Sequence, residues 1–147
     1  MSKIKVDTNL KPLFIEPCDM YVAIIDFLGK YNKNSHSIDI TCLKSEMSQP
    51  HLAQGTYRLW LTTLRETLSK FGFLEEDINA EQRILPEYIK IDPYHAYQAV
   101  INFLNKYNEN LQSVDIRNLV TKMQDSEHFL AAWKDWESLF LKYAQHT

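Results

Sequence analysis

Glycine and proline are scarce in this sequence, which has three glycines and five prolines in 147 residues. A sheet protein needs many tight turns, where these residues concentrate, whereas long helices joined by short connections need few of them. The scarcity disfavours an all-β fold and predicts an all-α fold. Because 45% of the residues are hydrophobic and 12% are aromatic, we expect a buried core rather than intrinsic disorder.

Residues that build metal, nucleotide or nucleophile sites are also few. Cys18 and Cys42 have no second cysteine or histidine at zinc-finger spacing, and no two of the five histidines are spaced i, i+4. The three glycines are too widely spaced for a phosphate-binding loop. We expect two buried or half-buried thiols without a disulfide between them. The sequence predicts no catalytic residue, no metal site and no cofactor.

Cys18 alone offers a candidate nucleophile, because it lies near an expected helix N-terminus, where the pKa of a thiol can be lowered. Its counterpart in the repeat described below is Tyr94. The duplicated design therefore does not depend on a thiol at this position, and we expect no reactivity there.

Basic charge and long apolar runs are missing as well. Lys and Arg total 16 against 19 Asp and Glu, for a formal net charge of −3. This balance provides no large basic surface and disfavours nucleic-acid binding. No run approaches the roughly 18 apolar residues that span a bilayer, and residues 1–12 lack the apolar core of a signal peptide. We expect a cytoplasmic protein without a membrane partner.

An internal repeat is the strongest signal that the sequence contains. Shifted by 76 positions, Tyr21 to Met47 aligns with Tyr97 to Met123 without a gap, and 14 of the 27 pairs are identical. Similarity continues downstream, where aromatic Tyr57 and Trp60 fall on Trp133 and Trp136. We expect two tandem three-helix repeats packed into one globular bundle, because each copy is short for an independent domain. The expected division is an N-terminal segment, a first repeat, a linker and a second repeat, at residues 1–12, 13–71, 72–88 and 89–147.

Three helices are expected in each repeat, and their starts carry capping residues. Asp92 followed by Pro93 predicts the start of the first helix in the second copy, and the Asn108 to Asn110 stretch predicts its end. Ser113 predicts the cap of the second helix, as Ser37 does in the first copy. The third helix is expected over about 126–143, and its counterpart follows Pro50 and ends at Gly72 in a left-handed conformation.

Short alternating apolar segments precede both copies. Ile89, Lys90 and Ile91 alternate in polarity, and Leu13 to Ile15 occupies the same register. These segments predict a short two-stranded pairing between the copies.

Three repeated features invite a functional interpretation, and each also has a structural one. Asp39 and Asp115 resemble an acid and base pair, but a carboxylate just after a serine cap also stabilises a helix start, which is the favoured interpretation. The repeated Tyr-Asn dipeptide is interpreted as helix-end packing beside a left-handed asparagine rather than a ligand clamp. Trp133 and Trp136 are expected in the core, with an exposed interface anchor as the alternative.

One stretch of the second copy resembles a known protein family. Ser113-Val114-Asp115-Ile116, then Leu119 and Met123, then Ala131-Ala132-Trp133-Lys134-Asp135-Trp136 follow the helix from Tyr97 to Tyr107. This order resembles small helical bacterial proteins encoded near polymorphic toxins and contact-dependent growth inhibition loci. The resemblance covers roughly Ala96 to Phe140, and the first copy departs from it, with Tyr57-Arg58-Leu59-Trp60 in place of the tryptophan stretch.

The resemblance implies an immunity protein, a non-catalytic inhibitor that binds and blocks a cognate toxin, as a monomer or weak dimer. Many such toxins are nucleases with basic clefts, so an acidic surface would favour association. Glu75, Glu76 and Asp77 in the linker are the dense acidic candidate for partner binding, with Trp133 and Trp136 as the second candidate. A helical adaptor module and a regulator of a nucleic-acid-related function remain as alternatives.

Overall fold

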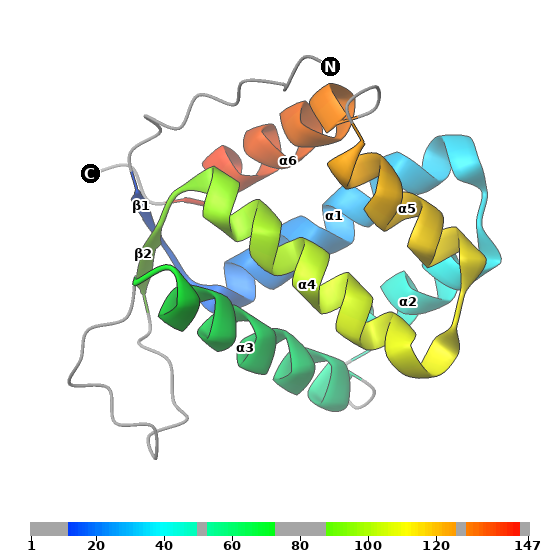
Figure 1. Cartoon of the computed structure of the whole chain (residues 1–147), viewed down its shortest axis with the longest axis horizontal. Coiled ribbons are helices and arrows are strands. Elements are labelled where there is room, and N and C mark those ends of the chain that lie inside the picture. The colour runs from blue at the N-terminus through cyan, green and yellow to red at the C-terminus, as the bar shows by residue number, and fades with distance from the viewer. Residues whose placement is uncertain (1–11, 50–52, 73–87, 126–128, 145–147) are drawn as a thin grey trace.

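The computed structural model describes residues 12–49, 53–72, 88–125 and 129–144. These residues form six helices and a small two-stranded sheet (Figure 1). The predicted mostly helical fold is confirmed. The elements in chain order are β1 (Leu13–Ile15), α1 (Pro17–Ser35), α2 (Ile38–Ser48), α3 (Ala53–Lys70), β2 (Ile89–Ile91), α4 (Pro93–Leu111), α5 (Val114–Gln124) and α6 (Phe129–Tyr143).

The element bounds follow the 76-residue register of the sequence. Strand β1, helix α1 and helix α2 have the same lengths as β2, α4 and α5, and each begins 76 positions before its counterpart. Helices α3 and α6 also begin 76 positions apart, at Ala53 and Phe129. The same local sequence signals therefore produce the same local structure in the first half, residues 12–72, and in the second half, residues 88–144.

The two strands pair with each other, as predicted. They run antiparallel, with Leu13 opposite Ile91, Phe14 opposite Lys90 and Ile15 opposite Ile89. Because Phe14 and Lys90 are equivalent positions of the two halves, the pairing is locally two-fold symmetric. The alternating pattern places the isoleucines in the core and leaves Phe14 and Lys90 at the surface, where Lys90 Nζ lies 5.6 Å from the Phe14 ring centroid.

The predicted helix caps are confirmed. Asp92 accepts a hydrogen bond from His95 N at the start of α4. Ser37 caps α2, and Ser113 caps α5, each by accepting from the backbone N–H three residues later. These bonds satisfy donors that a helix N-terminus otherwise leaves without partners. Gly72 has φ 76°, the left-handed conformation expected of it just after α3.

The prediction for the ends of α1 and α4 is wrong in one respect. The left-handed residues are His36 and Gln112, with φ 50° and 55°, rather than an asparagine, and α4 continues to Leu111. The physical reason is that Asn32 stays helical and uses its side chain on the next cap. Its Oδ1 accepts from Ser37 N at 2.6 Å and its Nδ2 donates to Ser37 O at 3.2 Å.

Asn108 makes the same two bonds with Ser113, at 2.7 and 3.0 Å. In each half the asparagine therefore fixes the angle between two consecutive helices, because it holds the backbone of the residue that caps the second one. The asparagine of the repeated Tyr-Asn dipeptide therefore has a structural role.

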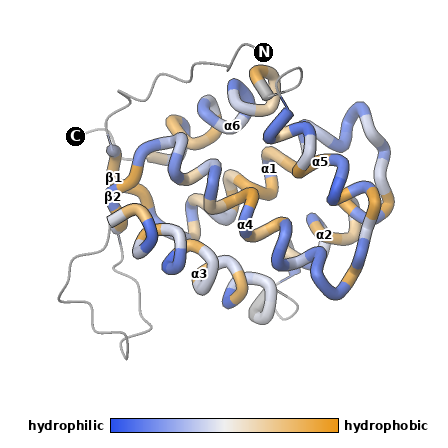
Figure 2. The backbone as a smooth tube through the Cα atoms, viewed as in Figure 1, coloured by the Kyte–Doolittle hydropathy of each residue, from blue (hydrophilic) through white to orange (hydrophobic). Residues whose placement is uncertain are grey.

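The third helix of each half lies along the first helix of the other half. Helix α3 packs along α4, and helix α6 packs along α1 (Figure 1). At these contacts the Trp60 and Phe103 ring centroids are 5.7 Å apart, and those of Phe27 and Trp136 are 6.2 Å apart. Apolar residues gather on the inner faces of the helices and form one shared core (Figure 2). Every described helix falls short of the combined length and apolar character that a bilayer-spanning segment needs.

Candidate functional site

The N-termini of α2 and α5 are joined by two reciprocal hydrogen bonds. Ser37 Oγ donates to Asp115 Oδ2 at 2.6 Å, and Ser113 Oγ donates to Asp39 Oδ2 at 2.5 Å. Each serine thus accepts a backbone bond for its own helix and donates to the carboxylate of the other half. Both aspartates lie in the first helical turn, as predicted, whereas the link between the halves was not predicted from the sequence. The sequence signal for this link was the Ser-x-Asp motif, which occurs in both halves.

Replacing Ser37 by alanine is expected to lower the free energy of unfolding by about 1–2 kcal/mol, because α2 loses its cap and Asp115 loses a donor. Urea denaturation followed by circular dichroism measures this change. Ser48→Ala is the matched control, since the Ser48 hydroxyl only donates to Lys44 O at an exposed helix end. The control should change stability by less than about 0.5 kcal/mol. Equal effects of the two substitutions would contradict the assigned role.

The expectation of buried thiols is wrong, because Cys18 and Cys42 are both exposed and free. Cys42 faces outward because the core stripe of α2 is formed by Ile40, Leu43 and Met47. The predicted absence of a disulfide between them is confirmed.

A lowered thiol pKa at Cys18 is also contradicted. Partial burial, a hydrogen bond to Glu16 and the charges of Asp19 and Glu16 raise the pKa of Cys18. Burial and these carboxylates together outweigh the backbone hydrogen bond from Asp19, which lowers the pKa of the thiol. Ligand atoms of Glu16, Cys18 and Asp19 lie within 4.8 Å of one another and could meet at a metal ion, but nothing else in this region points to a ligand.

His95 takes part in a helix-start contact, since its Nδ1 lies 2.6 Å from Asp92 Oδ2. His36 occupies the left-handed position after α1. The other three histidines, His51, His128 and His146, lie outside the described residues.

Trp133 and Trp136 belong to the core and have 6% and 0% of their surface exposed. The alternative interpretation as exposed interface anchors is therefore corrected, because α6 turns both rings toward α1 and α4 rather than toward solvent. Trp136 Nε1 also donates to Pro93 O at 3.0 Å, as Trp60 Nε1 does to Pro17 O at 3.1 Å. The acidic candidates Glu75, Glu76 and Asp77 lie outside the described residues.

The surface of the described residues has two hollows at equivalent positions of the two halves. Each lies between the first helix of one half and the second and third helices of the other half. The first, here called the lysine groove, lies between α1, α5 and α6 and has a volume of about 350 Å³. The residues that line it include Lys30, Tyr31, Asn34, Lys122, Ala132 and Asp135.

The second hollow, here called the glutamate groove, lies between α4, α2 and α3 and has a volume of about 680 Å³. Its equivalent positions are Lys106, Tyr107, Asn110, Glu46, Thr56 and Leu59. The first-helix wall has the same lysine, tyrosine and asparagine in both grooves, with Ser35 in one where Leu111 stands in the other. The opposite wall has Glu46 in the glutamate groove and Lys122 in the lysine groove.

The glutamate groove has its own internal hydrogen-bond network. Glu46 accepts from the Thr56 hydroxyl at 2.6 Å through one carboxylate oxygen and from the Tyr107 hydroxyl at 2.7 Å through the other. Burial, followed by the hydrogen bond to Glu46 and the charge of Glu46, raises the pKa of Tyr107. The phenol therefore stays protonated and remains a donor to the carboxylate.

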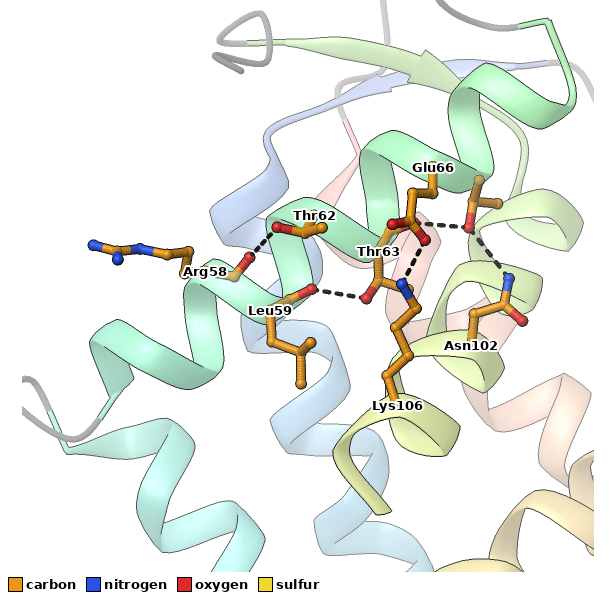
Figure 3. Close-up of polar contacts among 8 residues, drawn as sticks. Arg58, Leu59, Thr62, Thr63, Glu66, Asn102 and Lys106 are labelled. Atoms are coloured by element: carbon orange, nitrogen blue, oxygen red, sulfur yellow. Dashed lines mark hydrogen bonds and ion pairs between the residues drawn. The ribbon is translucent and has the colours of Figure 1, made fainter. Parts of the chain in front are cut away.

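The face where α3 meets α4 carries further polar contacts (Figure 3). Lys106 Nζ lies 2.6 Å from Glu66 Oε2, and Asn102 Nδ2 donates to Thr67 Oγ1 at 3.3 Å. Thr62 and Thr63 donate back to carbonyls of their own helix. Among the described residues, those lining a hollow of about 1100 Å³ beside this face all belong to α3 and include Arg58 and Arg65. The described residues provide a single wall there and define no site.

The chain matches no protein-family model, no curated protein and no solved structure. Its function must therefore be argued from its own residues, and the two equivalent grooves are the best-defined candidate surface among the described residues.

Proposed function

We propose that this chain is a tandem duplication of a three-helix unit and that it functions by binding another protein, as an inhibitor without chemistry of its own. The duplication is supported by the shared 76-residue register of the sequence and of the element bounds. It is also supported by reciprocal contacts at equivalent positions, such as the two Ser–Asp bonds between the halves.

The observation that carries the binding function is the contrast between retained and diverged positions. Many residues identical in both halves, such as Phe27 and Phe103 or Ser37 and Ser113, are buried and hold the core or the helix starts, and a shared lysine and tyrosine line both grooves. The far walls of the two grooves have changed, most clearly at Glu46 and Lys122. A scaffold that keeps its core and varies two surface hollows is suited to recognising partners, because specificity depends on the chemistry of exposed surfaces.

We infer that the partner is a bacterial toxin domain and that the chain is a cytoplasmic immunity protein. The resemblance of Ala96 to Phe140 to such proteins supports this assignment. The polar groups that a catalytic interpretation would use, Asp39 and Asp115, lie in the first turns of their helices and accept the bonds between halves. Inhibition by occlusion requires only a complementary surface and a slow dissociation rate.

The test uses the protein encoded directly before the gene for this chain, which the proposal expects to be the toxin. Isothermal titration calorimetry should show a 1:1 complex, and the bound toxin should lose its activity on its own substrate. Absence of binding to that toxin would contradict the immunity function. A gel-shift titration with duplex DNA and RNA is run in parallel, and tight, salt-sensitive binding would favour a nucleic-acid regulator instead.

A further inference from the structure

The glutamate groove shows how this fold holds a carboxylate. In that groove the Glu46 carboxylate is held by the hydroxyls of Tyr107 and Thr56, at 2.7 and 2.6 Å. The carboxylate belongs to α2 and the phenol to α4, so the two halves of the chain supply an anion and its donor. Charge-assisted hydrogen bonds of this kind are stronger than those between neutral groups.

The lysine groove keeps the tyrosine and lysine of the first helix, has Ala132 in place of Thr56, and has no carboxylate at the position of Glu46. Tyr31 and Lys30 stand where the glutamate groove has Tyr107 and Lys106, but Lys122 takes the place of Glu46. No hydrogen bond or ion pair engages the Tyr31 hydroxyl or Lys30 within the part of the chain that the structure describes. Lys122 Nζ lies 5.4 Å from the Tyr31 ring centroid, so a positive charge adjoins the phenol.

The net charges of the two grooves differ in sign. In the lysine groove Lys30 and Lys122 face one acid, Asp135, for a net charge of +1. In the glutamate groove Lys106 faces Glu46 and Glu109, for a net charge of −1. Lys106 is moreover paired with Glu66 at 2.6 Å. An incoming anion is therefore attracted to the net positive charge of the lysine groove. In the glutamate groove the donors are already bonded to carboxylates of the chain itself.

We propose that the lysine groove binds a carboxylate side chain from an acidic segment of a protein partner, with the carboxylate accepting from Tyr31 as Glu46 accepts from Tyr107 in the glutamate groove. Lys122, Lys30 and the Tyr31 hydroxyl are its donors. This inference rests on the proposed protein-binding function and specifies the chemistry of the partner.

The shape of the groove favours a peptide over a small anion. Phe27 and Leu119 form an apolar base, with 2% and 0% of their surface exposed, and Ala131 and Ala132 line the α6 side. Apolar lining with a few converging polar groups is typical of ligand sites. A separate hollow of about 150 Å³ shares Tyr31, Ser35 and Lys122 with the groove and is also lined by Asp115 and Asn118 of α5. An acidic residue flanked by apolar residues in an extended segment matches this combination.

The experiment is a titration of isotope-labelled full-length protein, followed by backbone amide chemical shifts. The probes are acetyl-Leu-Glu-Leu-amide and the same peptide with glutamine in place of glutamate. We expect the glutamate peptide to shift amides of α1 near Tyr31 and of α5 near Lys122. The glutamine peptide should bind about tenfold more weakly, because it loses the charge-assisted bonds. Equal binding of both peptides, or shifts confined to other surfaces, would overturn the proposal.

Substitution of Lys122 tests the donor set. Lys122→Glu introduces the residue type of the glutamate groove and should weaken the glutamate peptide at least about tenfold. Lys134→Glu makes the same change of charge at an exposed α6 position outside the groove and should alter binding by less than about twofold. Lys122→Met keeps the apolar stem and removes the charge, so it provides the same test if the first variant is poorly folded. Unchanged binding by a folded Lys122 variant would overturn the proposal.

Two further measurements distinguish this proposal from binding of small anions and from the proposed inhibitor function. Sodium acetate at the same carboxylate concentration should shift the same amides much less than the peptide, and an equal response would assign the groove to small anions and overturn the peptide partner. The toxin complex is also measured with Lys122→Glu. A toxin that binds the variant as tightly as the native chain would remove the groove from the interface and leave the inhibitor function standing.

Discussion

Replacing Trp136 by alanine is expected to lower the free energy of unfolding by about 3–5 kcal/mol, the range typical of a buried large aromatic side chain. The side chain is fully buried, packs edge-on against Phe27 of the other half and donates to Pro93 O at 3.0 Å. Its loss therefore leaves a cavity between the halves and a buried carbonyl without this donor. Urea denaturation of the full-length chain measures the effect.

Two comparisons make this prediction specific. Trp60→Ala should cost the same within about 1 kcal/mol, because Trp60 makes the equivalent ring contact with Phe103 and the equivalent bond to Pro17 O. Leu141→Ala, at a position 36% exposed on the same helix as Trp136, should cost less than about 1 kcal/mol. A Trp136 variant no less stable than the Leu141 variant would show that the contact between halves contributes little.

A fragment of residues 1–72 is expected to be unfolded as a monomer and to gain helix only by forming a dimer. Alone, it loses Phe103 as the partner of Trp60 and Trp136 as the partner of Phe27. A fragment of 72 residues also buries a smaller fraction of its surface than the full chain does and cannot compensate for these losses. Two copies can rebuild these contacts, because the first half carries its own phenylalanine and tryptophan at the equivalent positions, and Ser37 and Asp39 can repeat the reciprocal bonds.

The measurement is helicity by circular dichroism as the fragment is concentrated from micromolar toward millimolar, together with sedimentation equilibrium. Helicity should rise with concentration in step with the dimer fraction, since association and folding are coupled. The full-length chain is the control and should show no such dependence of its helicity. A fully helical monomeric fragment would show that each half folds independently and that the packing between halves is secondary.

The local structure follows from signals that act within a few residues. Ser37, Asp92 and Ser113 predict helix starts because a side-chain oxygen accepts a backbone N–H three residues later. The period of the apolar residues predicts which helix faces are buried, and the strand pairing followed from the alternation at Ile89 to Ile91. The exceptions were the helix ends. There the asparagines bond across a turn to a cap five residues away, and a dipeptide motif does not reveal such a bond.

The sequence by itself determined the helices, their caps, the two short strands and the 76-residue register, because each depends on neighbouring residues or on direct comparison of the two copies. Only the tertiary structure decided which third helix packs on which first helix. The two halves carry similar apolar stripes, so packing within a half and packing between halves look alike in sequence. The packing of helices from one half against helices of the other half also creates the Ser–Asp bonds. It places Lys122 beside Tyr31 and Glu46 beside Tyr107. The chemistry of both grooves is therefore a product of long-range packing, which no local pattern encodes.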